Sequence, residues 1–184
     1  DIEFGWVVDG LSIMMYFVVG TVSSLVFVYA TNYMQGEIRY TFFFTSLTLF
    51  AGSMLVLVSS PTLLQLLIGW ELVGVCSYLL IGHYWEKKEN SSAAMKAFIT
   101  NKIADIGLMI GIIVLALSTK TLRISEILYQ STHDYEDIKT VAYLGGVLLF
   151  IGAMGKSAQF PLHVWLPDAM AGPTPVSALM HAAT

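Results

Sequence analysis

Long apolar stretches constrain the fold of this chain more than any other feature of its sequence. Four of them, Leu11–Ala30, Tyr40–Ser59, Leu63–Gly82 and Val141–Phe160, have about the 20 residues that an α-helix needs to cross the hydrocarbon core of a bilayer. A fifth, Ala93–Leu117, is also long enough but contains charges. None shows the alternating polarity of a β-barrel strand, and backbone groups in lipid must be satisfied within the segment. The sequence therefore predicts an all-α fold, a polytopic membrane helix bundle.

Composition supports a membrane as the solvent and excludes several functions. The 184 residues are 56% hydrophobic and 12% charged, with a mean hydropathy of +0.71. The 9 basic residues are scattered, so we expect no nucleic-acid partner. A single cysteine, Cys76, excludes an internal disulfide framework and thiolate-rich metal sites. Because phosphate-loop, haem and flavin signatures are missing, we expect no cofactor, no metal and no catalytic bond-making residue.

The ends of the chain look like cuts through a longer protein. The first residue is Asp1, and no basic segment precedes the first apolar stretch. Val176–Thr184 is expected to begin a further helix, because Pro173 and Pro175 are tolerated at a helix start. We therefore expect an internal fragment, residues 1–184, that forms a single transmembrane region.

The connections between the stretches are short with one exception. Ser118–Thr140 is rich in charged residues, so we expect a loop in water with a short amphipathic turn at Ile124–Leu128. The distribution of lysine and arginine weakly favours Asn32–Arg39 and His83–Ser92 on the cytoplasmic or equivalent face.

Two charged residues lie where the bilayer makes charge expensive. Glu71 is midway along its apolar stretch, too deep to reach water, and needs a cationic partner. Lys156 follows an apolar run and precedes Pro161, which predicts a broken helix beside the lysine. A lysine can release its proton when buried, whereas an arginine cannot. Glu71 and Lys156 are therefore candidate proton-transfer residues; a structural ion pair and a lysine that reaches the interface are the alternatives.

Three further titratable residues are candidates for the same pathway. Lys102 and Asp105 are three residues apart on one predicted helix, so they can neutralise each other structurally or exchange partners with Glu71. His181 titrates nearest neutral pH and could pass protons to Lys156, although a histidine satisfied within the core is an equal reading.

Specific motifs resemble one membrane-protein family. They are Gly69-Trp70-Glu71-Leu72-Val73-Gly74, Asn101-Lys102-Ile103-Ala104-Asp105 and the run from Gly155-Lys156-Ser157 through Trp165-Leu166-Pro167-Asp168 to His181. Together they resemble the antiporter-like membrane subunit of respiratory complex I, of the chain 5 or subunit L type. The resemblance implies helices three to seven and the start of the eighth of an inverted-repeat fold. It also implies proton-transfer roles for Glu71, Lys102, Asp105, Lys156 and His181.

The resemblance further implies a proton-translocating subunit of an NADH–quinone-type oxidoreductase, and hence a part of an enzyme complex. NADH, FMN, iron–sulfur clusters and quinone would then act in partner subunits, and a neighbouring antiporter-like subunit would be a direct partner. The bacterial plasma membrane or the mitochondrial inner membrane is expected ahead of the thylakoid membrane. The alternatives are the large subunit of a multi-subunit Na⁺/H⁺ antiporter or of a membrane hydrogenase or F420H2-linked complex, and a purely structural membrane scaffold.

Overall fold

The computed structural model describes residues 3–133 and 135–182, which form helices joined by turns. In chain order the elements are α1 (Gly10–Tyr33), α2 (Tyr40–Val58), α3 (Leu63–Ile81), α4 (Lys88–Thr119), α5 (Ile124–His133), α6 (Tyr135–Lys156), the short 3₁₀ helix η1 (Asp168–Ala171) and α7 (Thr174–Ala182). Within these residues there is no β-strand, and the predicted all-α fold is confirmed. The expected helix at the end of the chain is α7, but 183–184 lie outside the described residues.

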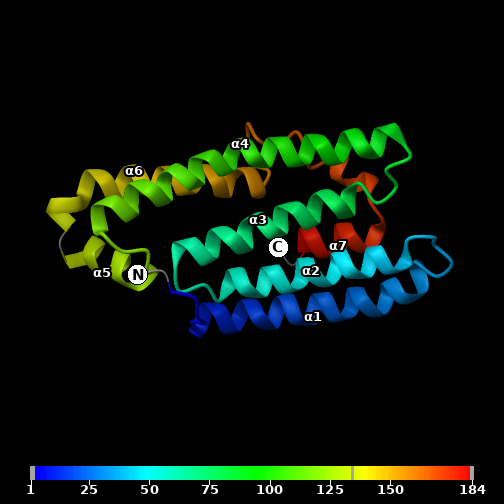
Figure 1. The fold of residues 1–184 in the computed structure, drawn as a ribbon, viewed down its shortest axis with the longest axis horizontal. Coiled ribbons are helices and arrows are strands. Elements are labelled where there is room, and N and C mark those ends of the chain that lie inside the picture. The colour runs from blue at the N-terminus through cyan, green and yellow to red at the C-terminus, as the bar shows by residue number, and fades with distance from the viewer. Residues whose placement is uncertain (1–2, 134, 183–184) are drawn as a thin grey trace.

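The long helices run roughly along one axis and form two packed groups (Figure 1). In one group α1, α2, α3 and α7 bury a core that includes Phe43, Leu47, Leu80 and Leu179. In the other, α4 and α6 lie side by side, and a side chain at Gly155 would clash with Ala104 across their interface. Small residues let membrane helices approach closely where burial of apolar area alone gives little drive. The two groups meet where α3 packs on α4.

Local sequence explains where two of the helices begin. The carboxylate of Asp9 caps α1 by accepting hydrogen bonds from the Ser12 backbone N–H at 2.7 Å and from its hydroxyl at 2.8 Å. These bonds to the charged form lower the pKa of Asp9. Thr62 caps α3 in the same way, accepting from the backbone N–H of Gln65 at 3.3 Å. Both caps fall at the start of apolar stretches, so the pattern and the cap agree on the helix boundary.

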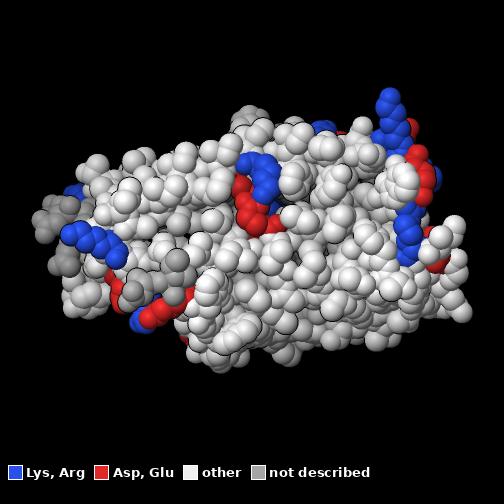
Figure 2. All heavy atoms as spheres, in the orientation of Figure 1, with Lys and Arg blue, Asp and Glu red and all other residues white. Residues whose placement is uncertain are grey.

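Charge is distributed as a membrane location requires. Figure 2 shows lysine, arginine and acidic side chains at the two ends of the molecule, with one further group midway along it, over α3 and α4. Among the residues that the structure describes, four helices, α1 to α4, are long and apolar enough to cross a membrane. Many of their large apolar side chains face outward, among them Phe17, Leu25 and Ile113. An apolar outer surface between polar ends is what a bilayer stabilises.

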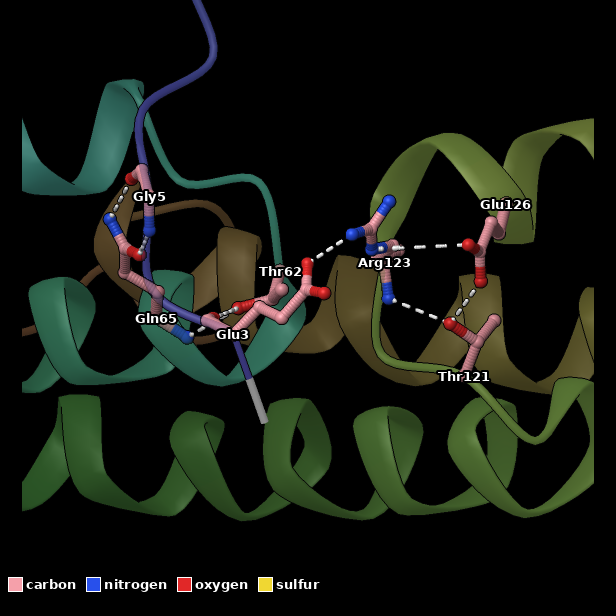
Figure 3. Close-up of polar contacts among 7 residues, drawn as sticks. All are labelled: Glu3, Gly5, Thr62, Gln65, Thr121, Arg123 and Glu126. Atoms are coloured by element: carbon pink, nitrogen blue, oxygen red, sulfur yellow. Dashed lines mark hydrogen bonds and ion pairs between the residues drawn. The ribbon is translucent and has the colours of Figure 1, made fainter. Parts of the chain in front are cut away.

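One end of the bundle is joined by polar contacts between segments far apart in the sequence (Figure 3). The Gln65 side-chain amide donates to the backbone carbonyl of Gly5 at 2.9 Å and accepts from its N–H at 3.0 Å. Arg123 forms an ion pair with Glu3, and the backbones on either side of it hydrogen-bond to those around Thr62. The segment before α1 and the turn after α4 are thus both attached to the start of α3.

Helix ends differ from the sequence prediction in several places, among them the start of α4, which lies at Lys88 and not at Ala93. The segment Ser118–Thr140, expected to be a loop in water, is mostly helical. Helix α4 continues to Thr119, α5 extends beyond the expected amphipathic turn, and α6 begins at Tyr135. Lys120, in the left-handed region with φ 55°, ends α4. The predicted helix break is present: α6 stops at Lys156, five residues before Pro161. The backbone turns there through Ala158, which has φ 48°.

A buried histidine lies at the opposite end of α3. His83 is 1% exposed, and its Nδ1 has no hydrogen-bond partner among the described residues. The rings of Phe42, Phe43 and Tyr84 pack around it. Burial lowers the pKa of His83, and the nearby Arg39 guanidinium lowers it further.

This environment predicts acid sensitivity at one end of the bundle. Glu37 and Glu86 oppose the shift, but the folded state still favours neutral His83, so its stabilising contribution is complete above about pH 6.5 and is lost as the pH falls below that value. We expect His83→Phe to reduce the fall in thermal unfolding temperature between about pH 7.5 and 5.5. The exposed His133→Phe is the control. An unchanged pH dependence in His83→Phe would show that His83 does not determine it.

Candidate functional site

The group of charges midway along the molecule comes from adjacent helices. Glu71 on α3 and Lys102 on α4 form an ion pair. Their side chains are 27% and 36% exposed, so the pair lies at the edge of the α3–α4 interface, and its carboxylate is not sealed in the core. The Lys102 ammonium also lies 5.4 Å from the centre of the Phe98 ring. An ion pair at this depth offsets the cost of placing either charge in the bilayer.

Asp105, one turn beyond Lys102 on α4, is bound by a different residue. It is 1% exposed, and its Oδ1 accepts a hydrogen bond from the indole N–H of Trp70 at 2.6 Å. Its other oxygen, Oδ2, has no donor among the described residues, and neither has Oδ1 of the buried Asn101. Two buried acceptors without donors are costly unless a cation or water meets them.

Lys156, the last residue of α6, faces the same interior. A side chain at Gly74 would place its Cβ 2.8 Å from the Lys156 Nζ, so the glycine makes room for the amine against α3. The ammonium lies 5.7 Å from the centre of the Trp70 ring. Asp105 is the carboxylate that acts on it electrostatically. A small cavity between these groups is lined by Gly74, Ser77, Tyr78, Ile81, Ala97, Phe98, Asn101, Lys102, Asp105, Lys156 and Trp165.

The segment after Lys156 is held over this cavity. The indole N–H of Trp165 donates to the carbonyl of Gly155 at 3.0 Å, and the same carbonyl at the end of α6 accepts from the backbone N–H of Ala158 at 3.2 Å. The centre of the His181 ring lies 6.4 Å from the centre of the Trp165 ring. An ion pair of 2.7 Å between Lys96 and Asp168 fastens η1 to α4. Helix α6 therefore ends at Lys156, and the chain that follows it brings Trp165 close to His181.

The structure brings together four of the five residues singled out from sequence. Glu71, Lys102, Asp105 and Lys156 lie around one site, whereas His181 is exposed and lies beside Trp165. Glu71 is paired with Lys102, not with Lys156, and Lys102 is not paired with its helix neighbour Asp105. Spacing of three residues permits the Lys102–Asp105 contact but cannot exclude a better partner on another helix.

Sequence reasoning missed the contribution of three residues. Trp70, Asn101 and Trp165 line or cross the site, although an aromatic or amide residue in an apolar stretch is usually a packing residue. The one available signal was position, because Trp70 directly precedes Glu71 and Asn101 directly precedes Lys102. Over the described ranges, 3–133 and 135–182, no group of three or more His, Cys, Asp or Glu residues could hold a metal ion.

Fold and site together define a class, the polytopic α-helical membrane proteins that hold carboxylates and amines in the middle of the bundle. Comparison with known sequences gives the family. This chain belongs to the NADH:quinone oxidoreductase/Mrp antiporter transmembrane family, whose profile matches residues 60–184. A second profile, NADH-ubiquinone oxidoreductase (complex I) chain 5 N-terminus, matches residues 1–44. The resemblance drawn from the motifs is thereby confirmed.

Similar relatives carry names that agree with this family. The chain is 48% identical to NAD(P)H-quinone oxidoreductase subunit 5, chloroplastic, of Acorus calamus, over all of its own length and 25% of that protein. It is also 48% identical to NAD(P)H-quinone oxidoreductase chain 5 of Synechocystis, over all of its own length and 27% of that protein. The chain thus spans about a quarter of the length of these relatives.

Solved structures share the fold. A chain of the Mrp complex from Dietzia is 30% identical with a TM-score of 0.86, and the match covers 94% of this chain and 19% of that one. A chain of the archaeal membrane-bound sulfane sulfur reductase is 20% identical with a TM-score of 0.86, over 100% of this chain and 38% of that one. The second likeness shows the fold alone.

Proposed function

We propose that this chain is part of a proton-translocating membrane subunit of an NADH–quinone-type oxidoreductase. One observation carries the proposal: Lys102, Asp105 and Lys156 line a small cavity midway along an apolar bundle, and Glu71 forms an ion pair with Lys102, so that two carboxylates and two amines make one connected group. Their formal charges cancel, so a proton can be gained or lost at the cluster without leaving several uncompensated charges in lipid. The names of the relatives supply the type of complex.

The Glu71–Lys102 pair suits the entry step. While the pair is closed, the ammonium stabilises the carboxylate. When Lys102 moves away, Glu71 becomes an uncompensated carboxylate and takes up a proton more readily. Asp105 lies one turn along α4 and can receive the released Lys102. A swing of one lysine between two carboxylates therefore couples a movement of charge to protonation at Glu71.

Lys156 suits the transfer step. With Lys102 beside Asp105, a second ammonium approaches the cavity and repels the charged form of Lys156, which favours release of its proton. The unpaired oxygens of Asp105 and Asn101 can orient water between the amine and the two carboxylates. Trp165 lines this cavity and lies 6.4 Å from His181 between ring centres, and we assign onward relay of the proton to His181.

The chemistry that drives these movements belongs to other subunits in this proposal. NADH, FMN, iron–sulfur clusters and quinone would act there, and a neighbouring antiporter-like subunit is the expected direct partner. The protein would reside in an energy-transducing membrane. Since relatives include a chloroplastic and a Synechocystis protein, photosynthetic membranes stand beside the bacterial plasma and mitochondrial inner membranes that the sequence favoured.

A second candidate function is favoured by one observation. The likeness to a chain of the Mrp complex, with a TM-score of 0.86, extends over almost all of this chain. The large subunit of a Na⁺/H⁺ antiporter would use the same titratable cluster without redox partners.

Purification of the full-length protein separates the two candidates. We expect a complex with flavin and iron–sulfur subunits that acidifies or alkalinises the lumen of lipid vesicles when a quinone is reduced, with no requirement for Na⁺. The decisive readout is the proton movement per quinone reduced. A complex without redox subunits, in which proton movement requires a Na⁺ gradient, would replace the oxidoreductase proposal with the antiporter.

A further inference from the structure

The Trp70 side chain contacts both Asp105 and Lys156. Its indole N–H donates to the Asp105 carboxylate at 2.6 Å, and its ring faces the Lys156 ammonium at 5.7 Å. It comes from α3, directly before Glu71, whereas Asp105 belongs to α4 and Lys156 to α6. Three helices therefore meet at this ring.

The partners of Lys102 explain why this contact matters. Lys102 has two carboxylates within reach, Glu71 across the interface and Asp105 three residues along its own helix, and it binds Glu71. Asp105 accepts from Trp70. Glu71 and Trp70 are adjacent on α3. Glu71 thus supplies the acceptor for Lys102, and Trp70 supplies a hydrogen-bond donor for Asp105, the carboxylate that competes with Glu71. A hydrogen bond to an ionised group is stronger than one between neutral groups, so the indole weakens the claim of Asp105 on Lys102.

We propose that Trp70 is a positioning residue that selects the partner of Lys102. Its N–H stabilises the Asp105 carboxylate through Oδ1, which weakens the attraction of the open Oδ2 for Lys102 and so keeps Lys102 on Glu71. Its ring keeps Lys156 beside Asp105. The inference rests on the proposed function and adds a residue to it. Loss of the N–H should raise the ratio of the Lys102–Asp105 pairing to the Lys102–Glu71 pairing by about tenfold. This is the scale of one charge-assisted hydrogen bond.

Two substitutions separate the N–H from the ring. Trp70→Phe keeps an aromatic face for Lys156 and removes the donor. Trp70→His restores a donor, because imidazole Nε2 lies as many bonds from Cβ as indole Nε1. The exposed Trp85, which stacks on Arg39 at one end of the bundle, provides the matched control Trp85→Phe.

The experiment uses the complex purified with each full-length variant. We expect cryo-electron microscopy of Trp70→Phe to show the Lys102 Nζ beside Asp105, together with a several-fold loss of proton movement per quinone reduced. Trp70→His should recover much of that loss, and Trp85→Phe should behave as the wild type. Lys102 remaining on Glu71 in Trp70→Phe would overturn the inference, as would equal impairment of the phenylalanine and histidine variants.

A comparison with Glu71→Gln keeps this inference separate from the proposed function. If Glu71→Gln moves protons normally, the proposed function fails. If Glu71→Gln is inactive while Trp70→Phe keeps both the wild-type pairing and the wild-type proton movement, the role of Trp70 alone is wrong.

Discussion

Glu71→Gln is expected to lower proton movement per quinone reduced by at least about tenfold while the complex still assembles. The amide keeps the size of the carboxylate but cannot take up a proton, and it leaves Lys102 without its partner on α3. Because the amide leaves the Lys102 ammonium unpaired in the bilayer, the change should also cost about 2 to 3 kcal/mol of folding free energy. Transport is expected to fall because the titratable proton is lost, in addition to this cost in stability.

Vesicles that contain the purified complex provide the measurement for Glu71→Gln. Quinone reduction and the change in lumenal pH are recorded together, so that a loss of coupling is distinguished from a loss of electron transfer. Glu89→Gln, in the exposed first turn of α4, is the matched control and should be silent. Wild-type proton movement in Glu71→Gln would mean that this carboxylate carries no proton.

Lys156→Met should be the more damaging change overall. Methionine fills a similar volume, but Asp105 loses the ammonium that compensates it, which we expect to cost up to about 3 kcal/mol of folding free energy. Proton movement should also fall at least about tenfold, because the side chain at the helix break no longer titrates. Lys156→Arg keeps the charge and so should preserve stability better, yet its proton stays bound at every accessible pH.

The two Lys156 variants are compared by thermal unfolding and by proton movement in vesicles. Lys88→Met, in the exposed start of α4, controls for the loss of a lysine. Normal proton movement in Lys156→Arg would show that Lys156 serves only as a fixed counter-charge. Equal stability of Lys156→Met and the wild type would show that Asp105 does not depend on it.

The helices were the most predictable part of the fold. A long apolar stretch in a membrane protein has little alternative to a helix, so the presence of α1, α2 and α3 follows from composition and length. The helix ends were harder to predict. A helix that leaves the bilayer can continue into water for as long as its local sequence favours a helix, as α4 does to Thr119. The break after Lys156 was visible because proline cannot continue a helix.

The site was predictable in its members but not in its pairings. Charge in an apolar stretch identifies Glu71, Lys102, Asp105 and Lys156 individually, since each would be expensive in lipid without a partner. Which carboxylate binds which amine depends on how α3, α4 and α6 pack, and that information is not local. Trp70 went unrecognised for the same reason, because its donor role exists only where α4 brings Asp105 against it.

The double variant Glu71→Gln/Lys102→Met tests the central claim most directly. Both charges of the pair are removed at once, so no unpaired charge is left in the bilayer at this position. If the pair were only structural, the double variant would restore what Glu71→Gln loses. Our account predicts that assembly and thermal stability return towards the wild type while proton movement per quinone reduced stays near the level of Glu71→Gln. Recovery of wild-type proton movement in the double variant would contradict it.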